Sequence, residues 1–436
     1  LVYQQYYTAY NQTKNYPKLI EYVDKFIAVP EDKYLLIPGM SKERLTGDKV
    51  QALYFRAVAF NQAFNDKDAN AADELTKARQ SAIDGLNLLG QIPKPANMTD
   101  DQFAQQKKPF VILFNYTAGS AAYRAKDYKN AIDSYNAYIA SSGSTDQTVA
   151  ATYFQIGVAY LQLAAQQTPA QAPASSQTPP NGQPPATTPA AATDASSQAL
   201  ADLYMNGFWS LARSIALKGP GETQMRSYLR AQMFNYEQPA CGSLLDDQMN
   251  ELIQLAGTQA TRPTTYSLPS ASDLGKVLQG SNLLSILTDL QGGGDKAKMT
   301  WLAVCGQEIP SVVGKIIDIT PGTDSIDFKV FTAATGEEIQ AGTAANLDVT
   351  VYTATPAAGA ASATPAAGAG QAQAQAAPPV QPEVSRLQKG DAIKFTGTLT
   401  KYDAQPFLLY FDKCQVDPSV IPPEKGAAKR PHRPGV

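Results

Sequence analysis

Histidine is almost missing from this chain. Its 436 residues include a single histidine, His432, which lies in a proline-rich terminal segment. Catalysis by a histidine base and most catalytic zinc sites need an imidazole held in a folded region. Ser-His-Asp and Cys-His catalysis, His-ligated zinc and histidine phosphotransfer therefore have no candidate. The sequence also lacks a Walker loop, a GxGxxG turn after a strand, CxxC and HExxH, so we expect no enzyme, no cofactor and no bound metal.

Charged residues are also scarce. They make up 17% of the chain, and 36 Lys and Arg against 39 Asp and Glu leave a net charge of −3. Such a balance gives no basic field for nucleic acid. The chain also has no uninterrupted apolar run of about 18 residues, the length that a membrane-spanning helix needs. We expect neither a nucleic-acid partner nor a membrane span.

The low charge accompanies abundant Gln, Ala, Thr and Tyr, a composition commoner in exported bacterial proteins than in cytosolic enzymes. The chain begins at Leu1 rather than at Met, which favours the removal of a preceding signal segment. We therefore expect an extracellular or periplasmic protein.

Three segments are too poor in large apolar residues to form a core. Residues 166–198 consist almost entirely of Ala, Pro, Gln, Ser and Thr, and residues 353–382 contain the unit ATPAAGA twice. Both are predicted to be flexible insertions. Residues 419–436 form a basic, proline-rich tail. Threonines in the two insertions are candidates for covalent glycans: Thr168, Thr178, Thr187, Thr188, Thr355 and Thr364.

The first half of the chain shows helical periodicity, with apolar residues at steps of three and four. Residues 14–27 align without gaps on residues 126–139, which indicates a repeated unit. One helical stripe in the second copy carries Tyr128, Ala131, Tyr135 and Tyr138. Gly119 and Gly157, in neighbouring predicted helices, leave room for a second helix to approach closely.

This spacing of small and aromatic residues resembles the tetratricopeptide repeat, in which helix pairs of about 34 residues stack into a superhelix. The resemblance covers about residues 1–220, with repeats over 1–165 and continuing helices over 199–300. It implies a concave groove that binds peptide segments or partner subunits. The candidates for such contacts are Tyr6, Tyr7, Tyr10, Tyr116 and Tyr123. The alternative is that these tyrosines pack between helices.

From about Ile309 the apolar periodicity changes to two, which predicts strands. The predicted strands are centred on residues 313–319, 326–330, 347–351, 393–399 and 407–411. Gly314 and Gly397 allow the sharp coiling that a small barrel needs. Residues 301–418, with the 353–382 insertion, resemble a small antiparallel barrel of the oligonucleotide/oligosaccharide-binding (OB) class; an open sandwich is the alternative. The predicted fold class is therefore α+β, in several domains.

The chain has three cysteines, Cys241, Cys305 and Cys414, so any intramolecular disulfide leaves one over. Cys305 precedes the first predicted strand and Cys414 ends the last. Closure of a barrel between these elements favours a Cys305–Cys414 disulfide. Three buried thiols are the alternative.

Together these features predict a non-enzymatic protein that binds other proteins or copies of itself. One interpretation is a self-assembling subunit of an extracellular fibre or envelope assembly. The alternatives are a monomeric envelope adaptor with a partner in the repeat groove, and an oligosaccharide-binding module that uses the barrel face. In an assembly, the basic tail would contact an acidic surface of a neighbour through Lys425, Lys429, Arg430 and Arg433.

Shortening residues 166–198 to a Gly/Ser linker is expected to leave the helical half folded, because the entropy of loop closure depends only weakly on length. The midpoint of thermal unfolding, followed by circular dichroism, should fall by less than about 8 °C. A larger decrease would show that the tract packs on the folded body.

Overall fold

The structure is a computed structural model that describes residues 2–143, 145, 147–167, 194–239, 241–355 and 379–424. Within these ranges the chain is mostly helical and ends in five strands. The α-helices are α1 Val2–Gln12, α2 Tyr16–Ile27, α3 Glu31–Leu35, α4 Lys42–Ala63, α5 Ala71–Gln91, α6 Asp100–Arg124, α7 Tyr128–Ser142, α8 Ala150–Gln167, α9 Asp194–Ala216, α10 Glu222–Glu237, α11 Gly242–Thr258, α12 Ala271–Gly280, α13 Leu283–Gly292, α14 Gly294–Val304 and α15 Gly336–Ala341. The strands are β1 Glu308–Pro321, β2 Ser325–Phe331, β3 Leu347–Tyr352, β4 Ala392–Ala404 and β5 Phe407–Val416. Short 3₁₀ turns lie at Gln147–Val149, Pro382–Arg386 and Pro418–Val420.

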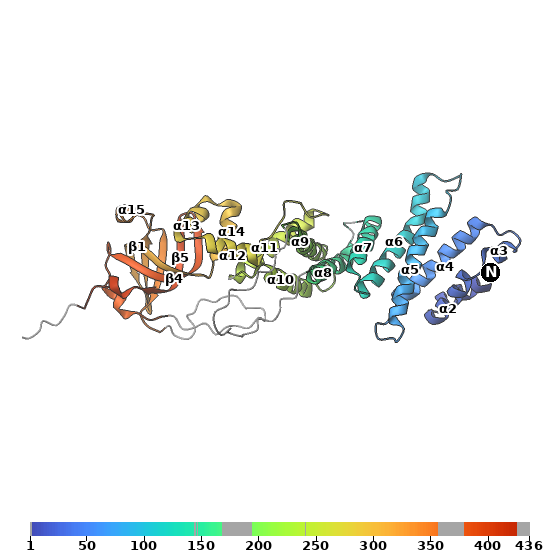
Figure 1. Cartoon of the computed structure of the whole chain (residues 1–436), viewed down its shortest axis with the longest axis horizontal. Coiled ribbons are helices and arrows are strands. Elements are labelled where there is room, and N and C mark those ends of the chain that lie inside the picture. The colour runs from blue at the N-terminus through green and yellow to red at the C-terminus, as the bar shows by residue number, and fades with distance from the viewer. Residues whose placement is uncertain are drawn as a thin grey trace, which may run out of the picture. The chain divides into compact units, whose positions relative to one another are not determined.

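The chain divides into two compact units, both drawn in Figure 1. The helical unit comprises Leu1–Leu229 and Met249–Ser267, and the barrel unit comprises Arg230–Gln248 and Leu268–Val436. The division passes through α10 and α11. The helices predicted over 199–300 are therefore divided between the two units.

In the helical unit, each helix packs mainly against its neighbours in sequence, and Figure 1 shows α2 to α9 following one another. The apolar residues form several small cores. One lies between α1, α2 and α4, a second between α4, α5 and α6, and a third between α6, α7 and α8. Because each core involves only helices close in sequence, local contacts dominate the stability of this unit.

The two segments that align in the sequence form the same turn and helix. Lys14 and Lys126 both take a left-handed backbone conformation, with φ of 56° and 61°. The next backbone amides, of Asn15 and Asp127, each donate to a carbonyl five residues earlier at 2.9 Å. The side chains of Asn15 and Asp127 then cap α2 and α7 by accepting the amide hydrogens of residues 18 and 130.

The turn recurs a third time, at the end of α9. Lys218 has φ of 57°, and the amide of Gly219 donates to the carbonyl of Ser214 at 3.0 Å. This six-residue closure satisfies carbonyls that the helix end leaves without a helical partner. The sequence alignment found two of the three copies that the described residues contain.

The predicted close approaches at Gly119 and Gly157 are confirmed. A Cβ on Gly119 of α6 would lie 2.6 Å from the Tyr135 ring of α7. A Cβ on Gly157 of α8 would lie 2.7 Å from Leu211 and 2.9 Å from the carbonyl oxygen of Gly207, both on α9. Hydrogen is therefore the only side chain that fits at these contacts.

The bounds predicted for the first insertion were too wide. Residues 166–167 belong to α8, and α9 begins at Asp194. Gln and Ala are good helix formers, so they extend both helices into a segment that looks uniform by composition. Residues 168–193 lie outside the described residues, as do residues 356–378 of the second insertion.

The five predicted strands are present and close into a barrel, so the open sandwich is excluded. The strand order is β1-β2-β3-β5-β4, and β4 pairs with β1. Four of these pairings are antiparallel, whereas β3 and β5 run parallel, which the all-antiparallel prediction missed. The interior is filled by apolar side chains from every strand, including Ile316, Phe328, Val349, Phe395 and Phe411.

Glycines in β1 and β4 permit tight strand contacts. A Cβ on Gly314 would lie 2.4 Å from Cγ1 of Val330 in β2. Gly397 lies where the β4–β5 register shifts, between Thr396 and Thr398, and its Cβ would lie 2.5 Å from Sγ of Cys414. Such a bulge bends the strand and helps so small a sheet to close.

Helices α12, α13 and α14 pack on the barrel through residues that belong to the same core, among them Leu274, Leu287 and Trp301. Figure 1 shows α13 beside the strands. The sequence did not predict α15, which lies between β2 and β3. Its first turn is fixed by a capping box in which Thr335 and Glu338 exchange hydrogen bonds.

Gly157→Ala is expected to lower the free energy of unfolding of the helical unit by about 1 to 3 kcal/mol, because the new methyl group meets the α9 backbone. Gly90→Ala is the matched control. Gly90 is an exposed residue of α5, and a Cβ there has no neighbour within 4 Å. The control should be neutral or stabilise by up to about 1 kcal/mol. Urea unfolding followed by circular dichroism measures both, and an equal response would contradict the close contact.

Candidate functional site

A cleft on the helical unit is lined by aromatic and apolar side chains from three helices. We call it the tyrosine cleft, and its volume is about 560 Å³. Its lining residues are Tyr54 of α4, Gln105, Lys108, Pro109, Ile112, Leu113 and Tyr116 of α6, and Tyr138 of α7. Most of the α6 residues are spaced as one helical stripe, at steps of three and four. The cleft therefore follows one face of α6.

Ring contacts hold the tyrosines of the cleft in place. The ring centroid of Tyr116 lies 5.3 Å from that of Tyr138 and 6.1 Å from that of Tyr135. Tyr54 meets Phe110 edge-on at 5.1 Å. Tyr135 is fully buried against Gly119, and its burial raises the pKa of its hydroxyl well above the usual range. The close α6–α7 contact thus sets the position of Tyr116.

The helical hydrogen bonding of α6 is interrupted at Gln105, a residue that lines the tyrosine cleft. Pro109 lies inside the helix and has no amide hydrogen, so the carbonyl of Gln105 loses the hydrogen bond that residue 109 would donate. Gln105 and Lys108 also line an adjoining hollow of about 270 Å³, together with Ser141 of α7. The tyrosine cleft therefore continues along α6 toward its N-terminal end.

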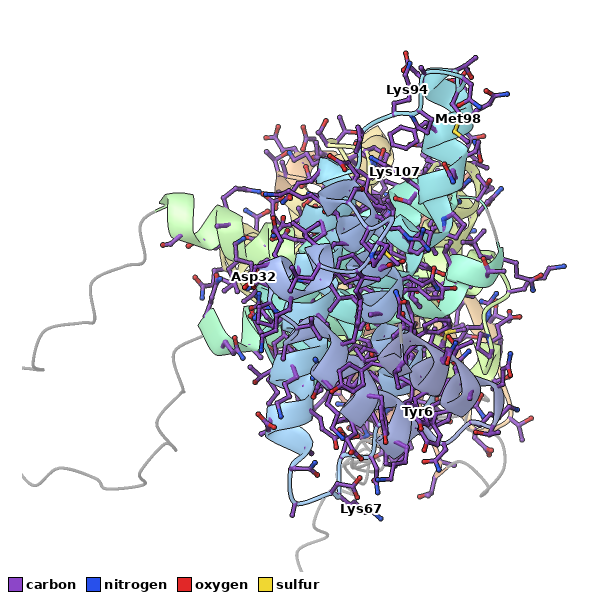
Figure 2. All side chains as sticks on the ribbon, turned by 90° about the vertical axis from the view of Figure 1, so that its right-hand side faces the viewer. Tyr6, Asp32, Lys67, Lys94, Met98 and Lys107 are labelled. Carbon is purple, nitrogen blue, oxygen red and sulfur yellow. A yellow bond between two sulfur atoms is a disulfide. The ribbon has the colours of Figure 1, made fainter. Side chains whose placement is uncertain are left out.

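Among the described residues, Lys108 is the only charged one that lines the tyrosine cleft. The neighbouring Lys107 points elsewhere: its Nζ lies 4.0 Å from the Phe103 ring centroid and donates to the Ile92 carbonyl at 3.4 Å. Partial burial lowers the pKa of Lys107. Figure 2 shows Lys107 near Lys94 and Met98, at the end of the α5–α6 pair where the two helices are connected, and well removed from Tyr6.

The five tyrosines predicted to bind a partner do not form one site. Tyr6 is 46% exposed and lies with Tyr3, Tyr10 and Tyr22 in a cluster on α1 and α2, with ring centroids 4.7 to 6.4 Å apart. We call this group the α1–α2 tyrosine cluster. Tyr7, in contrast, is only 2% exposed, so its side chain belongs to the core.

Of the other two predicted tyrosines, Tyr116 lines the tyrosine cleft and Tyr123 does not. Tyr123 is half-buried against Tyr128, at 6.0 Å between ring centroids, and burial raises its pKa. Sequence reasoning missed Tyr54, Lys108, Ile112 and Tyr138 as site residues. The stripe of α6 residues was a usable signal for two of them, but only the fold brings α4 and α7 to the same face.

The predicted Cys305–Cys414 disulfide is wrong: Cys305 is bonded to Cys241, with a Cα–Cα distance of 5.7 Å. The prediction assumed that the first and last strands are neighbours. In the barrel β4 lies between β1 and β5, so Cys414 is held away from the start of β1. Cys414 is a buried free thiol, and burial raises its pKa well above the usual value. A buried neutral thiol of this kind is unreactive.

The other predicted site residues lie largely outside the described part of the chain. Thr355 follows β3 and is exposed. The remaining glycan candidates, Thr168, Thr178, Thr187, Thr188 and Thr364, are outside the described residues, and so are the tail residues Lys425, Lys429, Arg430 and Arg433.

A buried carboxyl group lies beside the disulfide in the sequence. Glu237 ends α10 and is fully buried, and burial raises its pKa to about 7. The nearby Gln248 amide opposes this shift in part, but among the described residues no group makes a well-formed hydrogen bond to either carboxyl oxygen. Arg230 does not reach it, because the guanidinium pairs with Asp246 at 2.6 Å. Glu237 is therefore close to half-protonated at neutral pH.

Within the described ranges, no group of three or more His, Cys, Asp or Glu side chains is placed to hold a metal ion. None of the helices described has an apolar stretch long enough to cross a bilayer. Comparison with protein-family models, with curated proteins and with solved structures gave no match.

Because the pKa of Glu237 is raised in the folded protein, we expect the free energy of unfolding to fall as the pH rises. The pKa of Glu237 is about 7 in the folded protein and near 4.5 in the unfolded chain, so the folded state retains the proton longer. As the pH rises, the free energy of unfolding begins to fall near the pKa of Glu237 in the unfolded chain. The fall is complete once the pH exceeds the pKa of Glu237 in the folded protein. It amounts to about 3 kcal/mol.

Glu237→Gln should remove this dependence and raise the melting temperature at pH 8 more than at pH 5. Glu337→Gln is the matched control, because Glu337 is an exposed residue of α15 in the same unit. Melting curves across this pH range give the comparison. If the melting temperatures of Glu237→Gln and of the control vary with pH in the same way, Glu237 does not carry the buried proton.

Proposed function

We propose that this chain is a non-enzymatic, exported bacterial protein that acts by binding other proteins or copies of itself. The tyrosine cleft is the proposed contact site. The observation that carries this proposal is that side chains from α4, α6 and α7 line one aromatic cleft, in which Lys108 is the single charge contributed by the described residues. Aromatic side chains in a preformed hollow are typical anchors of protein interfaces.

Several features support a tetratricopeptide-like arrangement of the helical unit. The Lys14, Lys126 and Lys218 turns are alike, and glycine contacts join α6 to α7 and α8 to α9. Helices also pack mainly on neighbours in sequence. Stacked helix pairs of this class present grooves to peptide segments or partner subunits, which is the role proposed here for the tyrosine cleft.

The Cys241–Cys305 disulfide supports export. Disulfides persist in oxidising compartments such as the periplasm and the cell exterior, and are rare in the cytosol. The bond fastens the 230–248 segment to the end of α14 within the barrel unit. Cys241 and Leu244 of this segment also pack on the barrel core.

For the barrel unit, the order β1-β2-β3-β5-β4 with a parallel β3–β5 pair supports an OB-like fold. Binding of an oligosaccharide at its outer face is the weaker alternative. The polar groups there already pair with one another: Lys329 with Asp348, Thr350 with Asp327, and Tyr410 with Asp403. A sugar would have to compete with these bonds.

The proposal predicts self-association that depends on the tyrosine cleft. Sedimentation velocity over a concentration series should show association of the wild-type chain. Tyr116→Ala with Tyr138→Ala should weaken it by at least about tenfold, because two aromatic anchors are lost. Tyr6→Ala is the control at the α1–α2 tyrosine cluster and should associate like wild type.

A chain that stays monomeric at every concentration but binds another envelope protein through the tyrosine cleft would be a monomeric adaptor. Loss of association in Tyr6→Ala alone would place the contact at the α1–α2 tyrosine cluster. Circular dichroism of each variant checks that its helices are retained.

A further inference from the structure

The chemistry of the tyrosine cleft suits one kind of ligand. Tyr54, Tyr116 and Tyr138 present flat apolar rings that end in hydroxyl donors, and Gln105 and Lys108 add further N–H donors. The tyrosine cleft is therefore aromatic, rich in donors and nearly free of charge. An extended proline-rich segment matches it, because a polyproline II helix has no internal hydrogen bonds and leaves its carbonyls free to accept. Aromatic-lined grooves are the usual receptors of such segments.

The Gln105 carbonyl makes the match more specific. Because of Pro109, this carbonyl lacks its helical donor, and Gln105 is one of the residues that line the tyrosine cleft. A proline-rich ligand with interspersed Gln, Ala or Thr supplies backbone N–H groups that proline lacks. The preferred ligand is thus a mixed segment rather than pure polyproline.

The chain itself contains a segment of this composition. Residues 168–193 hold seven prolines, including the pairs Pro179–Pro180 and Pro184–Pro185, and no charged residue. Two other segments contain several prolines. Residues 353–382 hold five, fewer than the tract, and are richer in Ala and Gly. The tail from residue 422 carries four basic residues against one acid. Lys108 in the tyrosine cleft repels that tail but is compatible with the uncharged tract.

A tract from a second copy is favoured over the chain's own. The tract is attached at both ends, to α8 at Gln167 and to α9 at Asp194. The helices α8 and α9 pack against each other. An intrachain ligand would have to reach the tyrosine cleft and return within 26 residues. The tract of a neighbouring molecule has no such constraint.

We infer that the tyrosine cleft binds the proline-rich tract 168–193 of a second copy as an extended segment. This inference rests on the proposed function and names its partner. Each chain then has one cleft and one tract, so the contact is heterologous and propagates from copy to copy.

Complementation between two variants tests this directly. The cleft variant carries Tyr116→Ala and Tyr138→Ala and keeps its tract. The tract variant has residues 168–193 replaced by a Gly/Ser linker of equal length and keeps its cleft. Each variant alone should be monomeric by sedimentation velocity, whereas an equimolar mixture should form a one-to-one complex. Ile112→Gln serves as a second cleft variant in case the double substitution does not fold.

A synthetic peptide of residues 177–190 gives the binding measurement. By calorimetry it should bind the tract variant at least about tenfold more tightly than a matched peptide with alanine at positions 179, 180, 184 and 185. It should not bind the cleft variant.

The outcomes separate this inference from the proposed function. If the tract variant associates like wild type but the cleft variant does not, the tyrosine cleft is the contact site but binds another part of the second copy, and the inference fails alone. If both variants associate like wild type, the tyrosine cleft is not the contact site, and the proposed site fails together with the inference. If the peptide binds but the mixed variants remain monomeric, the tract contacts its own cleft and the second-copy contact is overturned. A wild-type chain that is monomeric at every concentration overturns both the inference and the proposed self-association.

Discussion

No side chain larger than hydrogen fits between α6 and α7 at Gly119, or between α8 and α9 at Gly157. The helical unit depends on these close approaches, because they let Tyr135 and Leu211 fill the space that a Cβ would take. The cores are small and local, so each helix pair must be well packed by itself. The left-handed turns at Lys126 and Lys218 then direct the chain into the next helix.

The same packing creates the tyrosine cleft. With Tyr135 held under Gly119, Tyr116 and Tyr138 are left half-buried, with ring centroids 5.3 Å apart, and Tyr54 of α4 lines the same cleft. Residues that are only partly buried at the edges of two local cores thus gather on one face. Tyrosines such as Tyr7 and Tyr135 are fully buried in a core, whereas the tyrosines that line the cleft are accessible to a partner. The residue type is the same in both groups, and only the degree of burial distinguishes the two.

The barrel unit follows a different constraint, the order of its strands. Because β4 lies between β1 and β5, the two sequence ends of the barrel are not neighbours, and the cysteines near them cannot pair. Cys305 instead fastens the 230–248 segment through Cys241. Burial of this segment also encloses Glu237, whose carboxyl takes no part in a salt bridge with Arg230.

The sequence by itself determined the local features. These are the helical and strand halves, five strands near their observed positions, the repeated turn and helix at Lys14 and Lys126, and the need for glycine at residues 119 and 157. These follow from periodicity and side-chain size, which act over a few residues. Only the tertiary structure decided which strands pair, that β3 and β5 run parallel, and that Cys241 rather than Cys414 meets Cys305. It also decided that Tyr116 joins Tyr54 and Tyr138, because residues distant in sequence become neighbours only through packing.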